Sequence, residues 1–175
     1  AKTNKSVLLL DSDLRLPTIH NHLGFTNRVG LSDVILGRMD IEDVILKPQT
    51  IENLSIITSG SLPPNPAELL NSKKMFDIID GLAKKFDVII MDSPPAIVTD
   101  AQTLATKADG VLYVLQPGKT RAAAAKIPIE EFRRVGANLV GVIFNRIPRN
   151  REHYYGGYTY YSGQYYTKKD YYHST

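Results

Sequence analysis

The chain of 175 residues contains no cysteine, which excludes disulfide bridges, thiolate metal sites and iron–sulfur ligation by cysteine. Long apolar runs are also missing. The longest hold about six residues, whereas a membrane-spanning helix needs roughly 20. No signal-peptide pattern opens the sequence. We therefore expect a soluble protein whose association with a membrane would require a partner.

Positive and negative charges balance over most of the chain. Residues 1–145 hold 16 Lys and Arg against 16 Asp and Glu, whereas residues 146–175 hold five against two. The net charge of +3 and the pI near 9.0 therefore belong to the C-terminal segment. This distribution does not support a uniformly basic nucleic-acid-binding surface.

Five apolar runs predict buried strands, and helical patterns separate them. The runs are SVLLLD (6–11), LSIIT (54–58), DVIIMD (87–92), GVLYVLQ (110–116) and LVGVIFN (139–145). Their near-continuous apolar character is typical of strands covered on both faces. Helices are expected at 66–85, 99–108 and 120–135, the last distorted at Pro128, with short helical pieces around 31–36 and 41–46. This alternation predicts an α/β fold with a doubly wound, mainly parallel sheet flanked by helices.

Polar side chains follow three of these strands. Asp11 and Asp13 end the first strand, Asp92 ends the third, and Asn145 ends the last. Ligands of such sheets bind at the carboxyl ends of the strands, so we expect these groups to converge there. A single Asp at a strand end is more often a loop or cap residue, but clustered carboxylates repel unless a cation neutralises them. Mg²⁺ takes one or two carboxylates together with phosphate oxygens, so the pattern predicts a nucleoside-triphosphate site.

These residues match a family. VLLLDSDLRLP resembles the second Walker-type motif and DVIIMDSPP resembles the Walker B motif of the bacterial tyrosine kinases, P-loop proteins that autophosphorylate and regulate capsule and exopolysaccharide synthesis. SGSLPPNPAELLNS, Asn145 and a C-terminal tyrosine cluster are also similar to that family. Septum-positioning and plasmid-partition ATPases share a similar Walker B motif, but the combination with the tyrosine cluster is highly specific.

The resemblance implies roles for individual residues, with ATP and Mg²⁺ as cofactors. Asp11 would activate the incoming tyrosine hydroxyl, Asp13 would support the metal site, and Asp92 would hold Mg²⁺ directly or through water. Asn145 would contact the adenine. Arg15 belongs to the same motif as Asp11 and Asp13, and we group it with the nucleotide-binding residues without a defined role.

One motif of the family does not occur in these 175 residues, namely a P-loop of the form GxxxxGK[ST]. In the family this loop lies a few tens of residues before the DSDLR motif, on a preceding strand and helix. Two explanations remain open: the sequence is a fragment of a longer kinase, or it is a truncated relative that has lost nucleotide binding. The intact downstream motifs favour the fragment.

Nine of the ten tyrosines lie between Tyr154 and Tyr172, in a segment without Val, Ile, Leu or Phe. We expect the folded domain to span 1–147 and a disordered tail to span 148–175. By resemblance the tail is the autophosphorylation substrate. Its tyrosines are Tyr154, Tyr155, Tyr158, Tyr160, Tyr161, Tyr165, Tyr166, Tyr171 and Tyr172. The alternatives are a module that stacks these rings on single-stranded nucleic acid or sugars, a partition-type ATPase, and a merely solubilising tail on an unrelated domain.

The resemblance also implies partners and a location. In the firmicute arrangement the kinase is separate from a transmembrane polysaccharide co-polymerase, or adaptor, whose cytoplasmic end activates it. We therefore expect a cytoplasmic protein that lies at the inner face of the membrane through this adaptor. The family further implies a homo-oligomeric ring, a cognate tyrosine phosphatase and no nucleic-acid partner.

Overall fold

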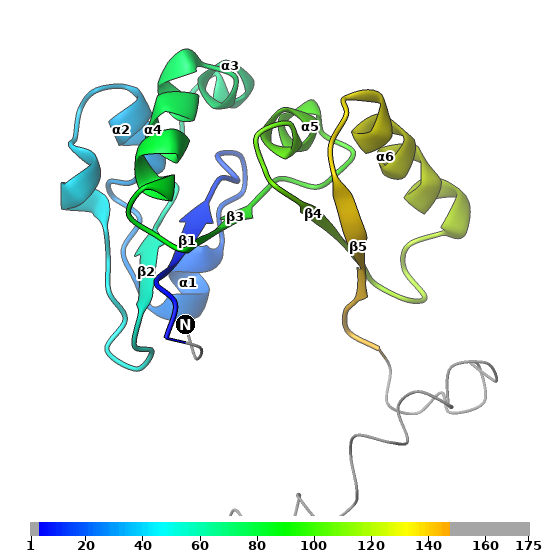
Figure 1. Cartoon of the computed structure of the whole chain (residues 1–175), viewed down its shortest axis with the longest axis horizontal. Helices are drawn as coiled ribbons and strands as arrows, with labels where there is room; N and C mark the ends of the chain where they lie inside the picture. The colour runs from blue at the N-terminus through cyan, green and yellow to red at the C-terminus, as the bar shows by residue number, and fades with distance from the viewer. Residues whose placement is uncertain (1–3, 148–175) are drawn as a thin grey trace, which may run out of the picture.

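The computed structural model describes residues 4–147, in which strands alternate with helices (Figure 1). The strands are β1 (Val7–Asp11), β2 (Leu54–Ile57), β3 (Val88–Asp92), β4 (Val111–Leu115) and β5 (Leu139–Phe144). The helices are α1 (Ile19–Leu23), α2 (Leu31–Ile35), the 3₁₀ helix η1 (Ile41–Val44), α3 (Pro66–Leu70), α4 (Lys73–Ala83), α5 (Thr99–Ala105) and α6 (Ala122–Arg134). The predicted tail, 148–175, lies outside the described residues.

All extended strand pairs in the described part of the chain are parallel. β1 lies between β2 and β3, with Val7 opposite Leu54 on one side and Val88 on the other. β4 pairs with β5 in a second sheet. Parallel neighbours require crossover connections, and helices supply them here. The predicted α/β fold, with parallel sheets flanked by helices, is confirmed.

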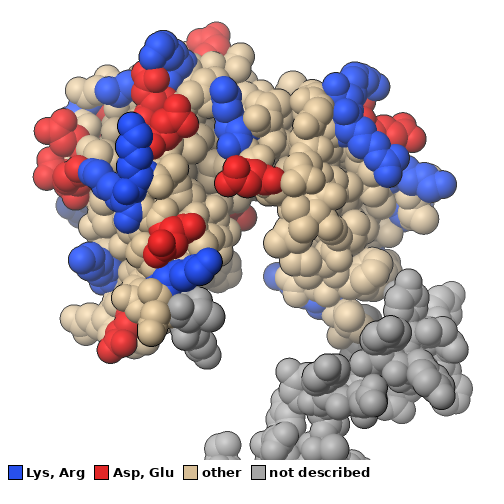
Figure 2. Space-filling view, viewed as in Figure 1, with Lys and Arg blue, Asp and Glu red and all other residues tan. Residues whose placement is uncertain are grey.

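The prediction of one sheet whose strands are covered on both faces is wrong for the second half of the domain. Among residues 4–147 no strand pairs with the outer edge of β3 or with the facing edge of β4, so two sheets form. Exposed and half-buried positions alternate along β3 and β4. Ile90 is 52% exposed and Val114 is 53% exposed. Figure 2 shows a surface without charged side chains over β4 and β5, beside the basic side chains of α6.

The helix predicted at 66–85 is two helices, α3 and α4. Pro66 opens α3, where its fixed φ suits the first turn. Ser72 then separates them, because its hydroxyl donates to the Leu69 carbonyl at 2.7 Å and accepts from the Met75 amide at 3.2 Å. A serine side chain that bonds the backbone in this way ends one helix and caps the next.

The hydrophobic core lies between the three-stranded sheet and the helices that cover it. β1 contributes Leu8 and Leu10, and both are fully buried. The other buried members come from the Asp13–Arg15 turn, β2, α2, η1, α3, α4 and α5: Leu14, Ile57, Leu31, Val34, Ile35, Val44, Leu69, Leu70, Met75, Ile78, Ile79, Leu82 and Leu104. This packing fixes β1 and β3, and therefore fixes the residues at their ends. Within residues 4–147, no helix has the length and apolar character needed to cross a bilayer.

Candidate functional site: carboxylates at the ends of β1 and β3

Asp11 and Asp92 lie side by side at the last positions of β1 and β3. They are opposite one another in the register of the parallel pair. The ladder continues one residue further, because the Ser12 amide donates to the Asp92 carbonyl at 2.8 Å. The convergence of these two carboxylates at one sheet edge, predicted from the sequence, is confirmed.

Asp11 is fully buried, which is unusual for a carboxylate. Desolvation raises its pKa to about 6, and the charges of Asp92 and Asp13 add to the increase, whereas backbone amides of Asp13 and Ile19 oppose it. In the described part of the chain, Asp11 Oδ2 and Ser12 Oγ are buried and have no hydrogen-bond partner. A buried oxygen without a partner costs free energy, so Asp11 and Ser12 are candidates for contact with a ligand.

Asp13 sits in a tight turn directly above Asp11. Its amide donates to Asp11 Oδ1 at 3.3 Å, and its own Oδ1 accepts from the Arg15 and Leu16 amides at 3.0 Å each. This side-chain turn fixes the direction of the Asp13 carboxylate. In the sequence DSDLR the Asp13 amide thus contacts the Asp11 carboxylate, and the charge of Asp13 helps to raise the pKa of Asp11.

Asp92 completes a cluster of three negative groups. Asp92 is exposed, yet desolvation by its surroundings and then the charge of Asp13 raise its pKa. Among residues 4–147, no group of three His, Cys, Asp or Glu side chains is arranged to hold a metal ion by itself.

Arg15 binds a residue that the sequence analysis missed. Its Nε donates to Asp100 Oδ2 at 2.7 Å, and its second guanidinium nitrogen donates to Asp100 Oδ1 at 3.3 Å. The Asp100 side chain is 1% exposed and lies in the first turn of α5. Nothing in the sequence pairs positions 85 residues apart, so only the fold reveals this contact.

The structure does not bring Asn145 to the three carboxylates. Its amide donates to the Leu115 carbonyl at 2.8 Å, which extends the β4–β5 pair, and its side-chain oxygen accepts from the Arg146 amide. Figure 1 shows the end of β5 away from the ends of β1 and β3. Because no ladder joins β3 to β4 among residues 4–147, the second sheet is not aligned with the first. The nine predicted phosphorylation sites lie outside the described residues.

A cavity of about 740 Å³ lies between β3 and β4. Its walls are mainly apolar side chains of the two strands, and Asp92 and Ser93 lie at one end. Here "the seam" means this space, lined by Ile89, Ile90, Met91, Leu112, Tyr113 and Val114. An apolar space between two strands with free edges is a place where a further strand could pair.

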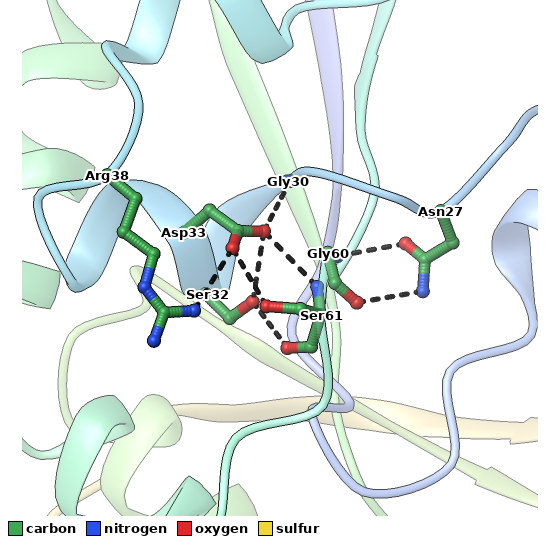
Figure 3. Close-up of polar contacts among 7 residues, drawn as sticks. All are labelled: Asn27, Gly30, Ser32, Asp33, Arg38, Gly60 and Ser61. Atoms are coloured by element: carbon green, nitrogen blue, oxygen red, sulfur yellow. Dashed lines mark hydrogen bonds and ion pairs between the residues drawn. The ribbon is translucent and has the colours of Figure 1, made fainter.

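A second polar cluster, without orphaned groups, holds the loop that follows β2 (Figure 3). Asp33 Oδ2 accepts from the Gly30 and Ser61 amides at 3.1 and 3.2 Å, and its Oδ1 accepts from the Ser61 hydroxyl at 2.8 Å. Asn27 exchanges two hydrogen bonds with the Gly60 backbone, at 2.8 and 3.0 Å. Desolvation raises the pKa of Asp33, but the bonds from Ser61 and Gly30, together with Arg38, outweigh it and lower the pKa overall.

Replacing Asp33 with Asn is expected to destabilise the chain by about 2 kcal/mol, because buried donors lose a charged acceptor. The lowered pKa means that the stabilisation is present above about pH 4 and is lost as the pH falls through the folded-state pKa. In urea unfolding, the difference in the free energy of unfolding between wild type and Asp33→Asn should therefore become smaller below pH 4. The exposed Asp40→Asn is the control, with an expected change within about 0.5 kcal/mol. A gap that is constant with pH would contradict this account.

Parallel strands with helical crossovers, together with the likeness to solved structures, show a P-loop NTPase-like α/β fold. A family model described as "AAA domain" matches residues 1–134. The chain is 38% identical over 159 residues to tyrosine-protein kinase YwqD of Bacillus subtilis, covering 90% of this chain and 67% of YwqD. It is 33% identical over 158 residues to the putative tyrosine-protein kinase CapB of Staphylococcus aureus, covering 89% of this chain and 69% of CapB.

A solved structure agrees with these sequence matches. The kinase domain of the Escherichia coli tyrosine kinase ETK superposes with a TM-score of 0.79 at 30% identity, covering 82% of this chain and 56% of that one. The chain thus spans about two thirds of its curated relatives YwqD and CapB. It belongs to the bacterial tyrosine kinase family.

Proposed function

We propose that this chain is the catalytic part of an ATP-dependent protein-tyrosine autokinase that phosphorylates its own C-terminal tyrosine cluster and regulates capsule or exopolysaccharide synthesis. The observation that carries the proposal is the register pair of Asp11 and Asp92, with Asp13 above it. The named activity of YwqD and CapB supports the reaction class. The tyrosine cluster at 154–172 supports the choice of substrate.

In the proposed reaction, the phenolic oxygen of a tyrosine forms a bond to the γ-phosphorus of ATP. The bond from that phosphorus to the oxygen bridging to the β-phosphate breaks, and ADP leaves. The phenolic proton passes to Asp11. A carboxylate whose pKa is raised to about 6 is a better proton acceptor than an ordinary aspartate and is still ionised at neutral pH. The protein's task is therefore to position the reactants and to accept the proton.

The residues present fit Mg²⁺ as a cofactor. Asp13 and Asp92 are the proposed holders of the ion, and the orphaned Asp11 Oδ2 and Ser12 Oγ face the same end of the sheet. When bound, Mg²⁺ supplies positive charge that offsets the phosphates and the carboxylates. A neighbouring cation would also stabilise the ionised form of the buried Asp11. Arg15 and Asn145 are less direct candidates for nucleotide contacts, because Arg15 is already paired and Asn145 follows β5.

The phosphate cradle is proposed to come from a segment that the family carries before the DSDLR motif. Its strand would occupy the seam, where β3 and β4 have free edges and apolar walls. A glycine-rich loop after that strand would then end beside Asp92 and Ser93. The same strand would join the two sheets and set the position of β5 and Asn145.

The tyrosine cluster also suggests how the kinase is regulated. Each phosphate adds a charge of about −1.5 to −2, so nine phosphates would change the net charge of residues 146–175 from +3 to roughly −10 to −15. Such a reversal would drive neighbouring copies in a ring apart. We propose a transmembrane adaptor as activator, a cognate phosphatase as antagonist, and a location at the inner membrane face through the adaptor.

Incubating the complete protein and its adaptor with Mg-ATP is expected to place phosphotyrosine within residues 154–172, as mapped by mass spectrometry. Replacing all nine tyrosines with Phe should remove more than 90% of the label if the cluster is the substrate, on the order of a tenfold loss. Tyr113→Phe is the matched control, because Tyr113 packs edge-on against Phe132 in the folded domain. Phosphate found only outside the cluster would overturn the proposal.

A further inference from the structure

Arg15 has two attachments, and they lead to different parts of the site. Its backbone amide donates to Asp13 Oδ1 at 3.0 Å, and its guanidinium forms a two-point contact with Asp100. Asp100 belongs to α5, which continues from the loop that follows Asp92. One residue therefore connects the Asp13 turn, at the end of β1, to the segment that follows β3.

From this geometry we propose that the Arg15–Asp100 pair is a positioning latch that holds the Asp13 and Asp92 loops at the spacing the bound Mg-nucleotide requires. The inference rests on the proposed kinase function and deepens it. It assigns Arg15 an indirect role, in place of a direct contact with the nucleotide, and it adds Asp100 to the residues on which the reaction depends.

The burial of Asp100 makes the pair a strong constraint. Its side chain is 1% exposed, whereas that of Arg15 is 44% exposed. A carboxylate so deeply buried needs its counter-charge, and the planar guanidinium satisfies both oxygens at once. Releasing Arg15 leaves a buried charge unpaired, so the start of α5 is expected to move towards water.

The same release affects Asp13. The turn that directs its carboxylate is closed by the amides of Arg15 and Leu16. Leu16 is 78% exposed, whereas Leu14 is 1% exposed and holds the turn against the core, so the side chain of Arg15 adds a second attachment, which runs to α5. Contacts of this kind behind a metal holder commonly change metal affinity by about 10–100-fold when removed.

The test is a double-mutant cycle in the complete protein with its adaptor. Arg15→Gln and Asp100→Asn are each expected to raise the Mg²⁺ concentration for half-maximal binding of a fluorescent ADP analogue about tenfold. Both should also lower kcat for phosphotyrosine formation about tenfold, with KM for ATP at saturating Mg²⁺ changed less than about threefold. The double variant should resemble either single one, because both remove the same contact. Arg15→Lys, which keeps the charge without the two-point geometry, should fall in between.

The matched control is Asp77→Asn, which breaks the exposed Lys73–Asp77 pair on α4 and should change neither measurement. A direct contact of Arg15 with ATP would give the opposite pattern, with KM for ATP raised by Arg15→Gln but not by Asp100→Asn, and would overturn the latch. Lower melting temperatures with an unchanged Mg²⁺ requirement would also overturn it. If Asp100→Asn does not fold, the variants at position 15 decide the question. The Mg²⁺ requirement should then rise from wild type to Arg15→Lys and from Arg15→Lys to Arg15→Gln. A wild-type protein without phosphotyrosine overturns the proposed function itself, and the latch with it.

Discussion

Replacing Asp11 with Asn is expected to lower the rate of phosphotyrosine formation by about 10³-fold or more while making the metal-free chain more stable at neutral pH. The loss follows because the amide cannot accept the phenolic proton and carries no charge for the cation. The gain follows because Asp11 is fully buried, so its ionised form is costly in the absence of a ligand. We expect the gain in the free energy of unfolding to be about 1–2 kcal/mol, since the buried amide also lacks a full set of partners.

The pH dependence of this gain has a definite sign. The pKa of Asp11 is about 6 in the folded chain and 3.8 in the unfolded chain, so the folded state binds the proton more tightly. Protonation of Asp11 therefore stabilises the wild type fully below pH 3.8, and this stabilisation of the wild type is lost as the pH rises through 6. Between pH 4.5 and 7.5 the wild type should lose about 2 kcal/mol that Asp11→Asn does not lose. Urea unfolding without Mg²⁺ measures both curves, and parallel curves would refute the assignment.

Replacing Gly30 with Ala is expected to destabilise the domain by about 3 kcal/mol or more. A Cβ at position 30 would overlap the Thr58 carbonyl oxygen and the Gly60 amide nitrogen, both of which are backbone atoms that cannot rotate away. The Leu31 and Ser32 amides bond to the Thr58 and Ser59 carbonyls at 2.8 and 2.9 Å, so these two segments are already in contact. The reason for glycine here is close approach of two backbones.

Gly81→Ala is the matched control for this experiment. Gly81 lies inside α4, and a Cβ there would meet no atom within 4 Å. Alanine favours the helix, so the control should gain about 0.5–1 kcal/mol. Thermal unfolding of both variants gives the comparison. Equal stability of Gly30→Ala and wild type would show that the loop after β2 moves freely.

The sequence predicted the first sheet and its acidic edge well. The runs that became β1, β2 and β3 are bounded by polar residues, and strand ends in a parallel sheet necessarily meet at one edge. For the first and third strands this placed Asp11 and Asp92 at one edge, whereas the same argument failed for Asn145, because β5 belongs to the second sheet. The side-chain turn at Asp13 was not predicted and is seen only in the structure.

Other features could not be predicted because they depend on distant partners. A run such as VLYVL is apolar whether or not a neighbouring strand covers it, so the uncovered face of β4 leaves no trace in the sequence. The Arg15–Asp100 pair joins positions 85 residues apart. The break between α3 and α4 depends on the hydroxyl of Ser72, which helical periodicity does not register.

The seam has a consequence for handling the 175-residue polypeptide in solution. Within residues 4–147, β3 and β4 each have one edge whose main-chain amides and carbonyls pair with no other strand, next to apolar side chains. Such rows recruit any extended peptide, including the same row on another molecule. Purified alone, the polypeptide should form concentration-dependent oligomers by edge-to-edge β-pairing. Adding a peptide that binds as a strand between β3 and β4 should dissociate these oligomers.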